Sequence, residues 1–324
     1  MNVAIIGATG LVGLSIIKVL DEENLPIENI YFYASSSSSN KSLYFKGNEY
    51  YIEELNDQSF EKNIDIAFFA VDEALSKRYA KIATSKGIIV IDNSSAWRMD
   101  EDVPLIVPEV NINELSKHNN LIANPNCTTI QAVVPLHVIN KNYKIKRIVY
   151  SSYQSVSGSG YKGIEDLING IDGKKQVFYP KQIAYNCIPH IDKFMDDGYT
   201  KEEVKLINET KKILNEPNLN ITATCVRVPV FVGHCISINV ECFHEIVISE
   251  LIEKFKTQAG IVVYEGYDYP TPVEVSGSNL VHIGRIRNDA SIINGVNLWV
   301  VADNVRKGAA YNAVQIAKHF WKEN

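Results

Sequence analysis

The sequence is poor in cysteine, in unbroken apolar stretches and in positive charge. Only five cysteines occur among 324 residues, with no C-x-x-C spacing, and the first residues carry no basic leader. We therefore expect reduced thiols, no metal and a cytoplasmic protein. No apolar run reaches the roughly 18 residues that cross a bilayer, which argues against a membrane partner. Acidic residues outnumber basic ones by 38 to 32, so no overall basic field attracts nucleic acid.

The first part of the sequence alternates between apolar patterns of strand length and apolar patterns of helix length. They are strand-length runs at residues 3–6, 30–33, 64–71 and 88–91, and amphipathic helix patterns at residues 11–20 and 74–86. This alternation predicts an α/β fold in which helices cover a parallel sheet.

After Asn126 the pattern changes to longer strands separated by helices of varied length. These strand-length runs lie at residues 145–153, 221–228, 235–243, 280–287 and 296–301. They predict a second, mixed α+β domain. A last helix pattern, at residues 306–321, follows a strand directly and is expected to close back onto the first domain. The predicted domains are residues 1–126 with 304–324, and residues 127–303.

The first predicted strand ends in a glycine-rich turn that opens the first helix. Glycines at this place permit a tight turn and let the backbone approach a pyrophosphate at the helix N-terminus. A G-x-x-G-x-x-G pattern alone is weak evidence, but its position between strand and helix favours a Rossmann-type dinucleotide-binding domain. The residues of this turn expected at the cofactor are Gly7, Thr9, Gly10, Leu11, Val12 and Gly13.

A run of five serines follows the second predicted strand. By composition such a run is typical of a flexible linker. NAD-binding proteins, however, often carry an acidic residue here that holds the ribose 2′-hydroxyl, and this chain has none to repel a 2′-phosphate. Serine hydroxyls and loop amides donate hydrogen bonds to such a phosphate. We therefore expect NADP, bound by Ser35, Ser36, Ser37 and Ser38.

Cys127 precedes an apolar helical pattern and is expected at a helix N-terminus. The dipole and the free amides there lower the pKa of a thiol, which favours a nucleophile. A lone cysteine is more often a small core residue, so its position alone leaves both interpretations open. The other four cysteines lie in apolar or strand-like segments and are interpreted as structural.

Arg227 and His234 stand at the two ends of a short apolar segment marked by Pro229 and Gly233. The segment brings a cation and a proton carrier near one another. Among the seven histidines, His234 alone has this setting, while the roles of His190 and His282 stay undecided.

Four motifs occur in a characteristic order along the chain. They are Asn-Pro-Asn-Cys-Thr-Thr at 124–129, Tyr-Gln-Ser-Val-Ser-Gly at 153–158, Arg-Val-Pro-Val at 227–230 with Gly-His at 233–234, and Leu-Trp-Val-Val-Ala-Asp-Asn-Val-Arg-Lys-Gly-Ala-Ala at 298–310. In order and spacing they resemble the aspartate-semialdehyde dehydrogenase family. The resemblance runs from residue 3 to about residue 320.

The resemblance implies a catalytic and dimerisation domain after the Rossmann-type domain, and an NADPH-dependent enzyme that makes L-aspartate 4-semialdehyde from L-4-aspartyl phosphate. This step serves the biosynthesis of lysine, threonine, methionine, isoleucine and diaminopimelate. Cys127 would attack the acyl phosphate, lose phosphate to form a thioester and release the aldehyde after hydride transfer. His234 would serve as acid/base for the thiol and the alkoxide, Gln154 would orient the acyl group, and Asn126 would stabilise the oxyanion. A homodimer is expected.

The resemblance also implies how charged groups meet the substrate. Arg227 matches the residue that grips the substrate carboxylate, and Arg98 and Lys205 match positions that bind phosphate. Glu202 matches the group that meets the substrate amine.

One of these assignments has a competitor within the same helix. Glu202 and Lys205 are three residues apart, a spacing that also suits an exposed ion pair worth only about 0.2–0.5 kcal/mol. Glu209 and Lys212 have the same spacing, and the sequence alone leaves the choice open. We select the first pair because its distance from Arg227 fits the family better.

Three more cofactor residues follow from the resemblance. Asn304 lies in the part of the family that contacts the nicotinamide amide, and Ser157 and Gly158 lie in the second motif. Many relatives have an arginine in the loop after the second strand, where this chain has Ser37. The preference for NADP over NAD is therefore expected to be modest.

Two other functions stay in competition. N-acetyl-γ-glutamyl-phosphate reductase performs the same chemistry on a longer substrate with a blocked amine, whereas a free amine calls for a carboxylate such as Glu202. A catalytically silent NADP-binding regulatory protein is disfavoured because Cys127, Gln154, Arg227 and His234 are all present.

Overall fold

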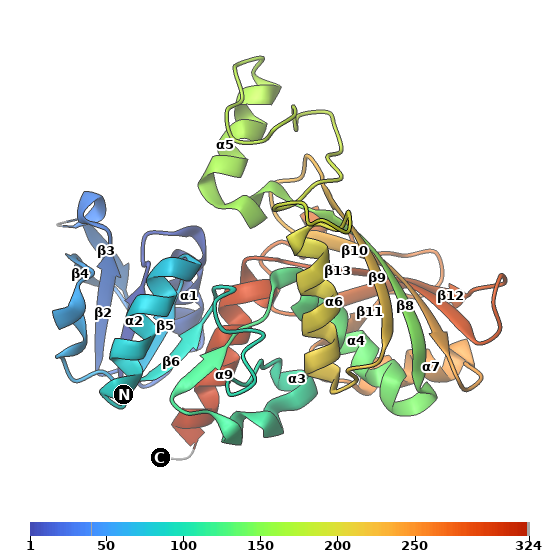
Figure 1. Ribbon diagram of the computed structural model, residues 1–324, viewed down its shortest axis with the longest axis horizontal. Helices are drawn as coiled ribbons and strands as arrows, with labels where there is room; N and C mark the ends of the chain where they lie inside the picture. The colour runs from blue at the N-terminus through green and yellow to red at the C-terminus, as the bar shows by residue number, and fades with distance from the viewer. Residues whose placement is uncertain (40, 323–324) are drawn as a thin grey trace. The chain divides into compact units, whose positions relative to one another are not determined.

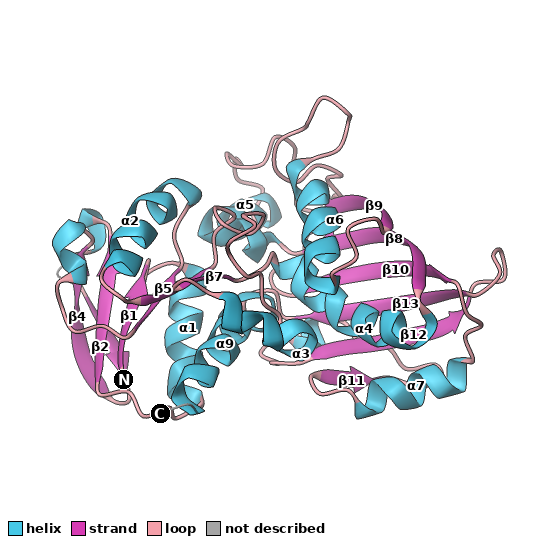
Figure 2. Cartoon of the chain, turned by 60° about the horizontal axis from the view of Figure 1, so that its bottom comes forward, coloured by secondary structure: helices cyan, strands magenta, loops and turns pink. Residues whose placement is uncertain are grey.

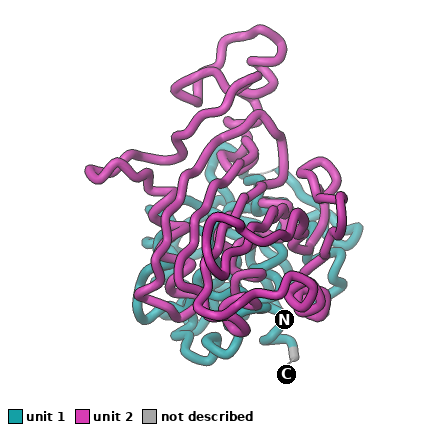
Figure 3. Tube along the Cα trace, turned by 90° about the vertical axis from the view of Figure 1, so that its right-hand side faces the viewer, with its two compact units in different colours: residues 1–126, 309–324 teal, residues 127–308 magenta. Residues whose placement is uncertain are grey.

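The computed structural model describes residues 1–39 and 41–322, which divide into two compact units (Figures 1 and 3). Unit 1 comprises Met1–Asn126 together with the chain from Ala309 onward, and unit 2 comprises Cys127–Gly308. The second boundary falls slightly later than residue 304, where the sequence predicts it. Residues 303–308 stay with unit 2 because Asp303 accepts hydrogen bonds from the backbone N–H groups of Gly277 and Gly308.

Unit 1 is built on a sheet whose strands are β1 (Asn2–Ile6), β2 (Asn29–Ala34), β3 (Ser42–Phe45), β4 (Asn48–Glu54), β5 (Ile66–Phe69), β6 (Ile89–Asp92) and β7 (Leu121–Ala123). In the described residues their order is β3-β4-β2-β1-β5-β6-β7. Neighbouring strands are parallel except β3 and β4, which form an antiparallel edge hairpin. Because β1 lies between β2 and β5, the carboxyl ends of these strands border the crevice where open α/β sheets bind ligands.

Helices cover both faces of this sheet. They are α1 (Leu11–Glu22), α2 (Glu73–Ser85), α3 (Pro108–Asn111) and α9 (Tyr311–Lys322), with short 3₁₀ turns η1 (Ser36–Ser38), η2 (Asp57–Phe60) and η3 (Ile112–Lys117). Helices α1 and α9 pack against each other, and α9 also packs against β6, while α2 packs against β5 and β6. The C-terminal helix therefore belongs to the first unit, as the sequence predicts.

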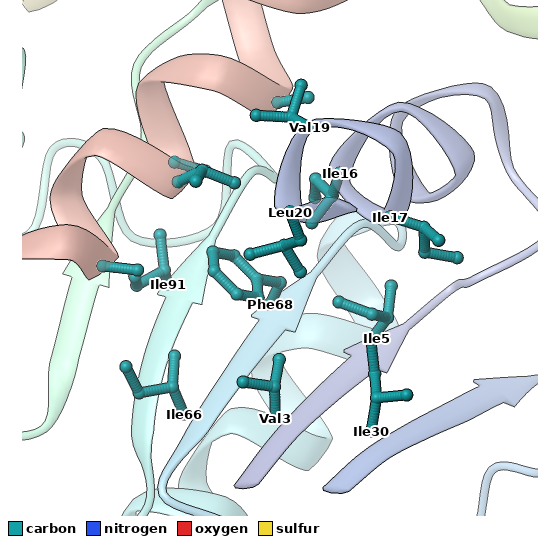
Figure 4. Packing of buried hydrophobic residues seen from close by; sticks show 14 of the residues in the cluster. Val3, Ile5, Ile16, Ile17, Val19, Leu20, Ile30, Ile66, Phe68 and Ile91 are labelled. Atoms are coloured by element: carbon teal, nitrogen blue, oxygen red, sulfur yellow. The ribbon is translucent and has the colours of Figure 1, made fainter. Parts of the chain in front are cut away.

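Strand β1 shows how the two-sided core forms. Val3 and Ile5 pack into a buried cluster with side chains of α1 (Figure 4). Ala4 and Ile6 belong to a second cluster that includes side chains of α2. Successive strand residues point to opposite faces, so a strand covered on both faces must be apolar throughout. This explains the unbroken apolar runs in the first part of the sequence.

Unit 2 contains a mixed sheet whose strands are β8 (Ile145–Gln154), β9 (Asn220–Arg227), β10 (His234–Cys242), β11 (Ile261–Val263), β12 (Val281–Asn288) and β13 (Gly295–Ala302). In the part of the chain that the structure describes, their order is β11-β12-β13-β10-β8-β9. The pairs β8–β9 and β11–β12 are parallel, and the remaining pairs are antiparallel.

The helices of unit 2 gather mainly on one face of this sheet. They are α4 (Cys127–Tyr143), α5 (Gly160–Ile171), α6 (Lys201–Leu214), α7 (Ile248–Thr257) and α8 (Pro272–Val275), with the 3₁₀ turn η4 (Val156–Ser159). A π-helical turn, η5 (Arg306–Ala310), precedes α9. Helices α4, α6 and α7 lie over one face (Figure 2), and none of the described helices is long and apolar enough to span a membrane. The opposite face, which carries Ser151, Tyr153, Ser237 and Asn239, is only partly buried.

The predicted fold class is confirmed, and each predicted strand has a counterpart in the structure. The β3–β4 hairpin and the short strands β7 and β11 were not predicted. Strand β4 escapes a pattern search because it buries only Ile52 among its residues and carries Glu49, Glu53 and Glu54. Its position is decided by backbone pairing with β2, which hydrophobic periodicity does not report.

Candidate functional site

A pocket in unit 1 lies at the carboxyl ends of β1, β2, β4 and β5. Its volume of about 380 Å³ is within the range of small-molecule sites. Of the predicted cofactor residues, Gly7, Thr9, Gly10, Ser35 and Ser36 line this pocket. Leu11, Val12 and Gly13 form the first turn of α1 behind the glycine turn. The predicted dinucleotide turn therefore borders a cavity of suitable size.

Two glycines of this turn are required by close approaches of the backbone. Gly7 has a φ of +90°, and a Cβ there would lie 2.3 Å from the carbonyl oxygen of Ala70. A Cβ on Gly13 would lie 2.2 Å from the carbonyl oxygen of Gly7. Only glycine tolerates both, so the turn holds β1 close to α1 and leaves the helix N-terminus facing the pocket.

The serine run forms an ordered turn at the end of β2. Ser36–Ser38 is a 3₁₀ turn, the Ser35 and Ser37 hydroxyls lie 2.9 Å apart, and the Ser39 hydroxyl donates to the Ser36 carbonyl at 2.7 Å. Its hydroxyls and amides stand beside the pocket instead of forming a free linker.

Seven lining residues are absent from the sequence-based prediction, and Glu54 is the most consequential of them. They are Ala34, Glu54, Leu55, Ala70, Val71, Leu75 and Tyr79. In the register of β2 and β4, Ala34 pairs with Glu54, and the Leu55 N–H donates to the Ala34 carbonyl at 2.9 Å. A carboxylate thus lines the same pocket as Ser35 and Ser36. It lies some twenty residues beyond β2, so its position depends on the pairing of β4.

Arg98 and Asn126 are buried in unit 1. The Arg98 guanidinium donates to the carbonyl oxygens of Asn124 at 3.0 Å and Asn93 at 2.7 Å. These residues follow β7 and β6, so Arg98 joins the ends of two strands. Asn126 is 7% exposed and directly precedes Cys127.

In unit 2, Cys127 is the first residue of α4, at the helix N-terminus that the sequence predicts, and it is partly exposed. The next residue, Thr128, accepts a hydrogen bond from the Gln154 side chain at 2.8 Å. One turn further on, the Gln131 amide donates to the backbone carbonyl of His234 at 3.1 Å. The first turns of α4 are therefore tied to the end of β8 and to the start of β10.

Glu202 lies in the same buried cluster. Its carboxylate accepts from the Gln154 amide at 3.3 Å, and its side chain is almost fully buried. Lys205 forms ion pairs with Asp192 at 2.7 Å and with Glu202 at 3.5 Å. The pair Glu202–Lys205 is therefore not an exposed pair on a solvated helix face.

Arg227 and His234 come together at the ends of β9 and β10. A Cβ placed on Gly158 would lie 2.8 Å from Nη1 of Arg227 and 3.2 Å from Nε2 of His234. Both side chains thus border the space that Gly158 leaves open. His234 is fully buried, and Nη1 of Arg227 also donates to the Ser155 carbonyl at 2.7 Å. Burial, with the Arg227 charge nearby, holds the pKa of His234 well below its usual range, so the ring is neutral at pH 7.

Asn304 and Ser157 are buried beside His234. The Asn304 side chain bonds to both Ser155 and Ser157. Asn304, which the sequence predicts to contact the nicotinamide amide, therefore already forms hydrogen bonds within the fold.

The cysteines differ sharply in environment. Burial raises the pKa of the Cys235 and Cys242 thiols to about 12, and burial together with Glu202 raises the pKa of Cys225. Cys127 is partly exposed and Cys187 is exposed. Cys187, which the sequence groups with the structural cysteines, follows a turn and is exposed, unlike the three buried ones.

Two family models match the chain in sequence. The semialdehyde dehydrogenase NAD-binding domain matches residues 2–118, and the semialdehyde dehydrogenase dimerisation domain matches residues 135–307. The chain is 49% identical to aspartate-semialdehyde dehydrogenase of Aquifex aeolicus, over 99% of this chain and 98% of that protein. It is 45% identical to aspartate-semialdehyde dehydrogenase 2 of Vibrio cholerae, over 98% of this chain and 96% of that protein.

A solved structure agrees with the sequence relatives. The crystal structure of Vibrio cholerae aspartate semialdehyde dehydrogenase II complexed with ASA superposes with a TM-score of 0.94 at 44% identity. The similarity covers 98% of this chain and 97% of that one. The match therefore extends over both units rather than over one domain alone.

The burial of the thiols predicts a selective reaction with iodoacetamide. Under native conditions Cys127 and Cys187 should be alkylated, whereas Cys225, Cys235 and Cys242 should react only after unfolding, because only accessible thiolates react. Peptide mass spectrometry after brief alkylation, with and without guanidinium chloride, measures each site. Fast native alkylation of Cys225 would contradict the packing of β9.

Proposed function

This chain belongs to the aspartate-semialdehyde dehydrogenase family, and we propose from that membership that it converts L-4-aspartyl phosphate to L-aspartate 4-semialdehyde. The product serves the biosynthesis of lysine, threonine, methionine and isoleucine. The observation that carries the proposal within the structure is that the buried side chains of Arg227 and His234 both approach Gly158, while the buried Gln154 donates to Thr128, the residue after Cys127. Acyl transfer is favoured by preorganised donors in a site that excludes water.

Cys127 is the proposed nucleophile. Its thiolate adds to the acyl carbon, the bond from that carbon to the phosphate oxygen breaks, and phosphate leaves a thioester on Sγ. Its place at the N-terminus of α4, the positive end of the helix dipole, favours the thiolate. Reduction of the thioester gives an alkoxide that collapses to the aldehyde and returns the thiolate.

The other cluster residues are proposed to orient and to stabilise. Gln154 orients the acyl group from the end of β8, and Asn126 stabilises the oxyanion with nearby amides. His234 is proposed as the acid/base group for the Cys127 thiol and for the alkoxide. Its full burial supports a role in chemistry, since a buried imidazole with an unpartnered nitrogen is costly unless it is used.

Charged groups are proposed to recognise the substrate. Arg227 pairs with the substrate carboxylate, and the carboxylate of Glu202 meets the free amine. Both carboxylates are buried, and the hydrogen bond from Gln154 to Glu202 favours this residue over Glu209 for that task. Arg98 and Lys205 are proposed to bind the phosphate.

The pocket of unit 1 fits a nicotinamide dinucleotide, and we propose NADP as the preferred one. The glycine turn would hold the pyrophosphate, and Ser35–Ser38 would hold the 2′-phosphate with hydroxyls and amides. When bound, the reduced cofactor supplies the hydride for the thioester. Glu54 in the same pocket opposes a second negative charge, which supports a modest preference rather than an exclusive one.

The proposal also covers the oligomeric state and the cellular compartment. The match to a dimerisation domain and the partly buried face of the unit 2 sheet support a homodimer. The structure describes all five cysteines and pairs none of them in a disulfide, which suits the cytoplasm.

Replacement of Cys127 by alanine should abolish turnover while changing the Kd for NADP by less than about threefold, because the thiol forms the covalent bond. The assay follows NADPH formation from aspartate semialdehyde, NADP and phosphate. A Cys187→Ala control should keep full activity. Intact-mass analysis of wild-type protein mixed with the semialdehyde, NADP and no phosphate should show an acyl adduct on Cys127. Faster turnover of N-acetyl-glutamate semialdehyde would instead favour the N-acetylated pathway enzyme.

The charge assignments predict opposite effects on two Michaelis constants. Arg98→Ala and Lys205→Ala should raise the KM for phosphate by about 10- to 100-fold, the loss of one charge-assisted hydrogen bond, with a smaller effect on the semialdehyde. Arg227→Ala should do the reverse. Lys211→Ala, at the far end of α6, serves as the control. Equal effects on both substrates in all three variants would show the charges to be wrongly assigned.

Cofactor choice should respond to the charges in the unit 1 pocket. Ser37→Arg should raise the NADP/NAD affinity ratio by about 10- to 100-fold through a two-point contact with the phosphate. Glu54→Gln should raise it by about 2- to 10-fold because a like charge is removed. Ser35→Asp should abolish the preference for NADP over NAD.

Binding titrations by protein fluorescence measure both dissociation constants without turnover. Glu53→Gln is the matched control, because the neighbouring carboxylate pairs with Lys62 instead of lining the pocket. An unchanged ratio in the Ser35, Ser37 and Glu54 variants would leave the serine turn without a role in cofactor choice.

A further inference from the structure

Asp92, the last residue of β6, is a fully buried carboxylate that takes no part in the proposed chemistry. Its Oδ1 accepts from the backbone N–H of Ser94 at 3.1 Å, and its Oδ2 accepts from the Ser94 hydroxyl at 2.6 Å. The hydroxyl of Ser76, in α2, also donates to this carboxylate. Each of these partners is a donor, so the position suits a carboxylate, which only accepts, and not an amide, which carries an NH₂ group.

The same hydroxyls hold the chain that follows β6. The Ser94 Oγ accepts from the backbone N–H of Ala96 at 3.1 Å. The Ser76 Oγ accepts from the indole N–H of Trp97 at 2.9 Å. An indole N–H only donates, so the proton of the Ser76 hydroxyl is left for the carboxylate. Through two serines, the carboxylate therefore holds the two residues that precede Arg98.

Arg98 closes this loop from its other end. Its guanidinium donates to the carbonyl of Asn93, the residue after Asp92, at 2.7 Å, and to the carbonyl of Asn124 at 3.0 Å. The backbone N–H of Asn124 donates to the carbonyl of Asp92 at 2.8 Å. The loop of residues 92–98 is thus bonded to itself and to the residue after β7, and its shape decides where the guanidinium lies.

Asp92 and Arg98 also attract each other. Burial raises the pKa of the Asp92 carboxyl, and the hydrogen bonds from the two serines and the nearby Arg98 charge oppose that rise. Arg98 itself is only 8% exposed. Loss of either charge from a buried pair is costly, so the carboxylate contributes to the placement of the guanidinium by its charge as well as through the loop.

We infer that Asp92 is a positioning residue for phosphate recognition, because it holds in place the loop that ends in Arg98. The inference rests on the proposed function and deepens it, since Arg98 is proposed there to bind the phosphate. Asp92 itself touches neither substrate nor cofactor in this role, and its effect passes through the guanidinium.

Asp92→Asn is the first test. Asparagine keeps the size of the side chain but offers a single acceptor oxygen and turns an NH₂ group toward a donor. The KM for phosphate, measured in the direction of NADPH formation, should rise by about 5- to 20-fold, because a displaced guanidinium weakens anion binding. The kcat at saturating phosphate and the KM values for the semialdehyde and NADP should stay within about threefold of wild type. An unchanged KM for phosphate would overturn the inference.

A double-mutant cycle shows whether Asp92 acts through Arg98. In an Arg98→Ala background, Asp92→Asn should change the KM for phosphate by less than about twofold, because the guanidinium that it positions is absent. Full multiplication of the two single effects would mean that the carboxylate acts on the whole unit, and the positioning role would fail. If Asp92→Asn does not fold, Ser94→Ala takes its place in the same cycle, with an expected rise of about 2- to 10-fold in the wild-type background.

Asp72→Ala is the matched control for loss of stability. Asp72 also belongs to unit 1, and its side chain accepts from the Leu75 N–H as the N-cap of α2. Its replacement should lower the urea midpoint of unfolding through loss of the cap, while the KM for phosphate stays within about twofold of wild type. A rise equal to that of Asp92→Asn would attribute both effects to destabilisation and would contradict the positioning role.

The loop is observed directly in ¹H–¹⁵N spectra of ¹⁵N-tryptophan-labelled protein, which contains three indole groups. The Trp97 signal, identified by its loss in Trp97→Phe, should shift in Asp92→Asn because the hydroxyl of Ser76 loses its acceptor. Trp299 is the internal reference, because its indole donates to the Pro270 carbonyl in unit 2. A Trp97 signal that stays in place in Asp92→Asn would show that the carboxylate does not hold the loop.

The outcomes separate this inference from the proposed function. An Arg98→Ala variant with the wild-type KM for phosphate would remove Arg98 from the phosphate site, and the inference would fail with that assignment. A raised KM in Arg98→Ala, together with an Asp92→Asn variant that equals wild type, would overturn the inference alone. Full activity of Cys127→Ala would overturn the proposed mechanism, whatever the result at position 92.

Discussion

The candidate site in unit 2 depends on the hydrogen bonds of one residue, Ser155. Its N–H donates to His234, its carbonyl accepts from Arg227, and its hydroxyl donates to Asn304. A buried polar group without a partner costs about 1–3 kcal/mol, so these three bonds are obligatory wherever the segment is buried. They orient the imidazole and the guanidinium through the backbone of one residue, and a shift of that residue moves both.

The sheet explains why groups far apart in sequence meet there. Strands β8 and β9 are parallel, and Gln154 pairs with Arg227 at their carboxyl ends. Strand β10 runs antiparallel to β8, so its first residue, His234, lies at the same edge. The start of α4 is fastened to this edge through Thr128 and Gln131. The four motifs form one cluster because the direction of each strand, rather than distance in the sequence, decides which strand ends lie at the same edge of the sheet.

Part of this arrangement is predictable from the sequence because it depends on residues that are neighbours in the chain. The rest depends on pairing between strands that are distant in the chain. The glycine turn and the helix start at Cys127 each involve a strand, a turn and a helix that follow one another directly in the chain. The sequence therefore predicts both. Glu54 was missed because its place beside Ser35 requires the parallel pairing of β2 and β4. Ser155 was missed because it acts through its backbone, which every residue shares. Its neighbours were recognised through side chains that resemble a family pattern.

The neutral state of His234 follows from its full burial and from the Arg227 charge nearby. Burial penalises the charged form of the ring, and repulsion from the guanidinium adds to that cost. An imidazolium there would also have to protonate Nδ1 against the Ser155 N–H. A neutral ring avoids these costs. In the proposed mechanism Arg227 supplies charge for an anionic substrate, the N-terminus of α4 favours the Cys127 thiolate, and the buried, neutral imidazole of His234 serves as the acid/base group.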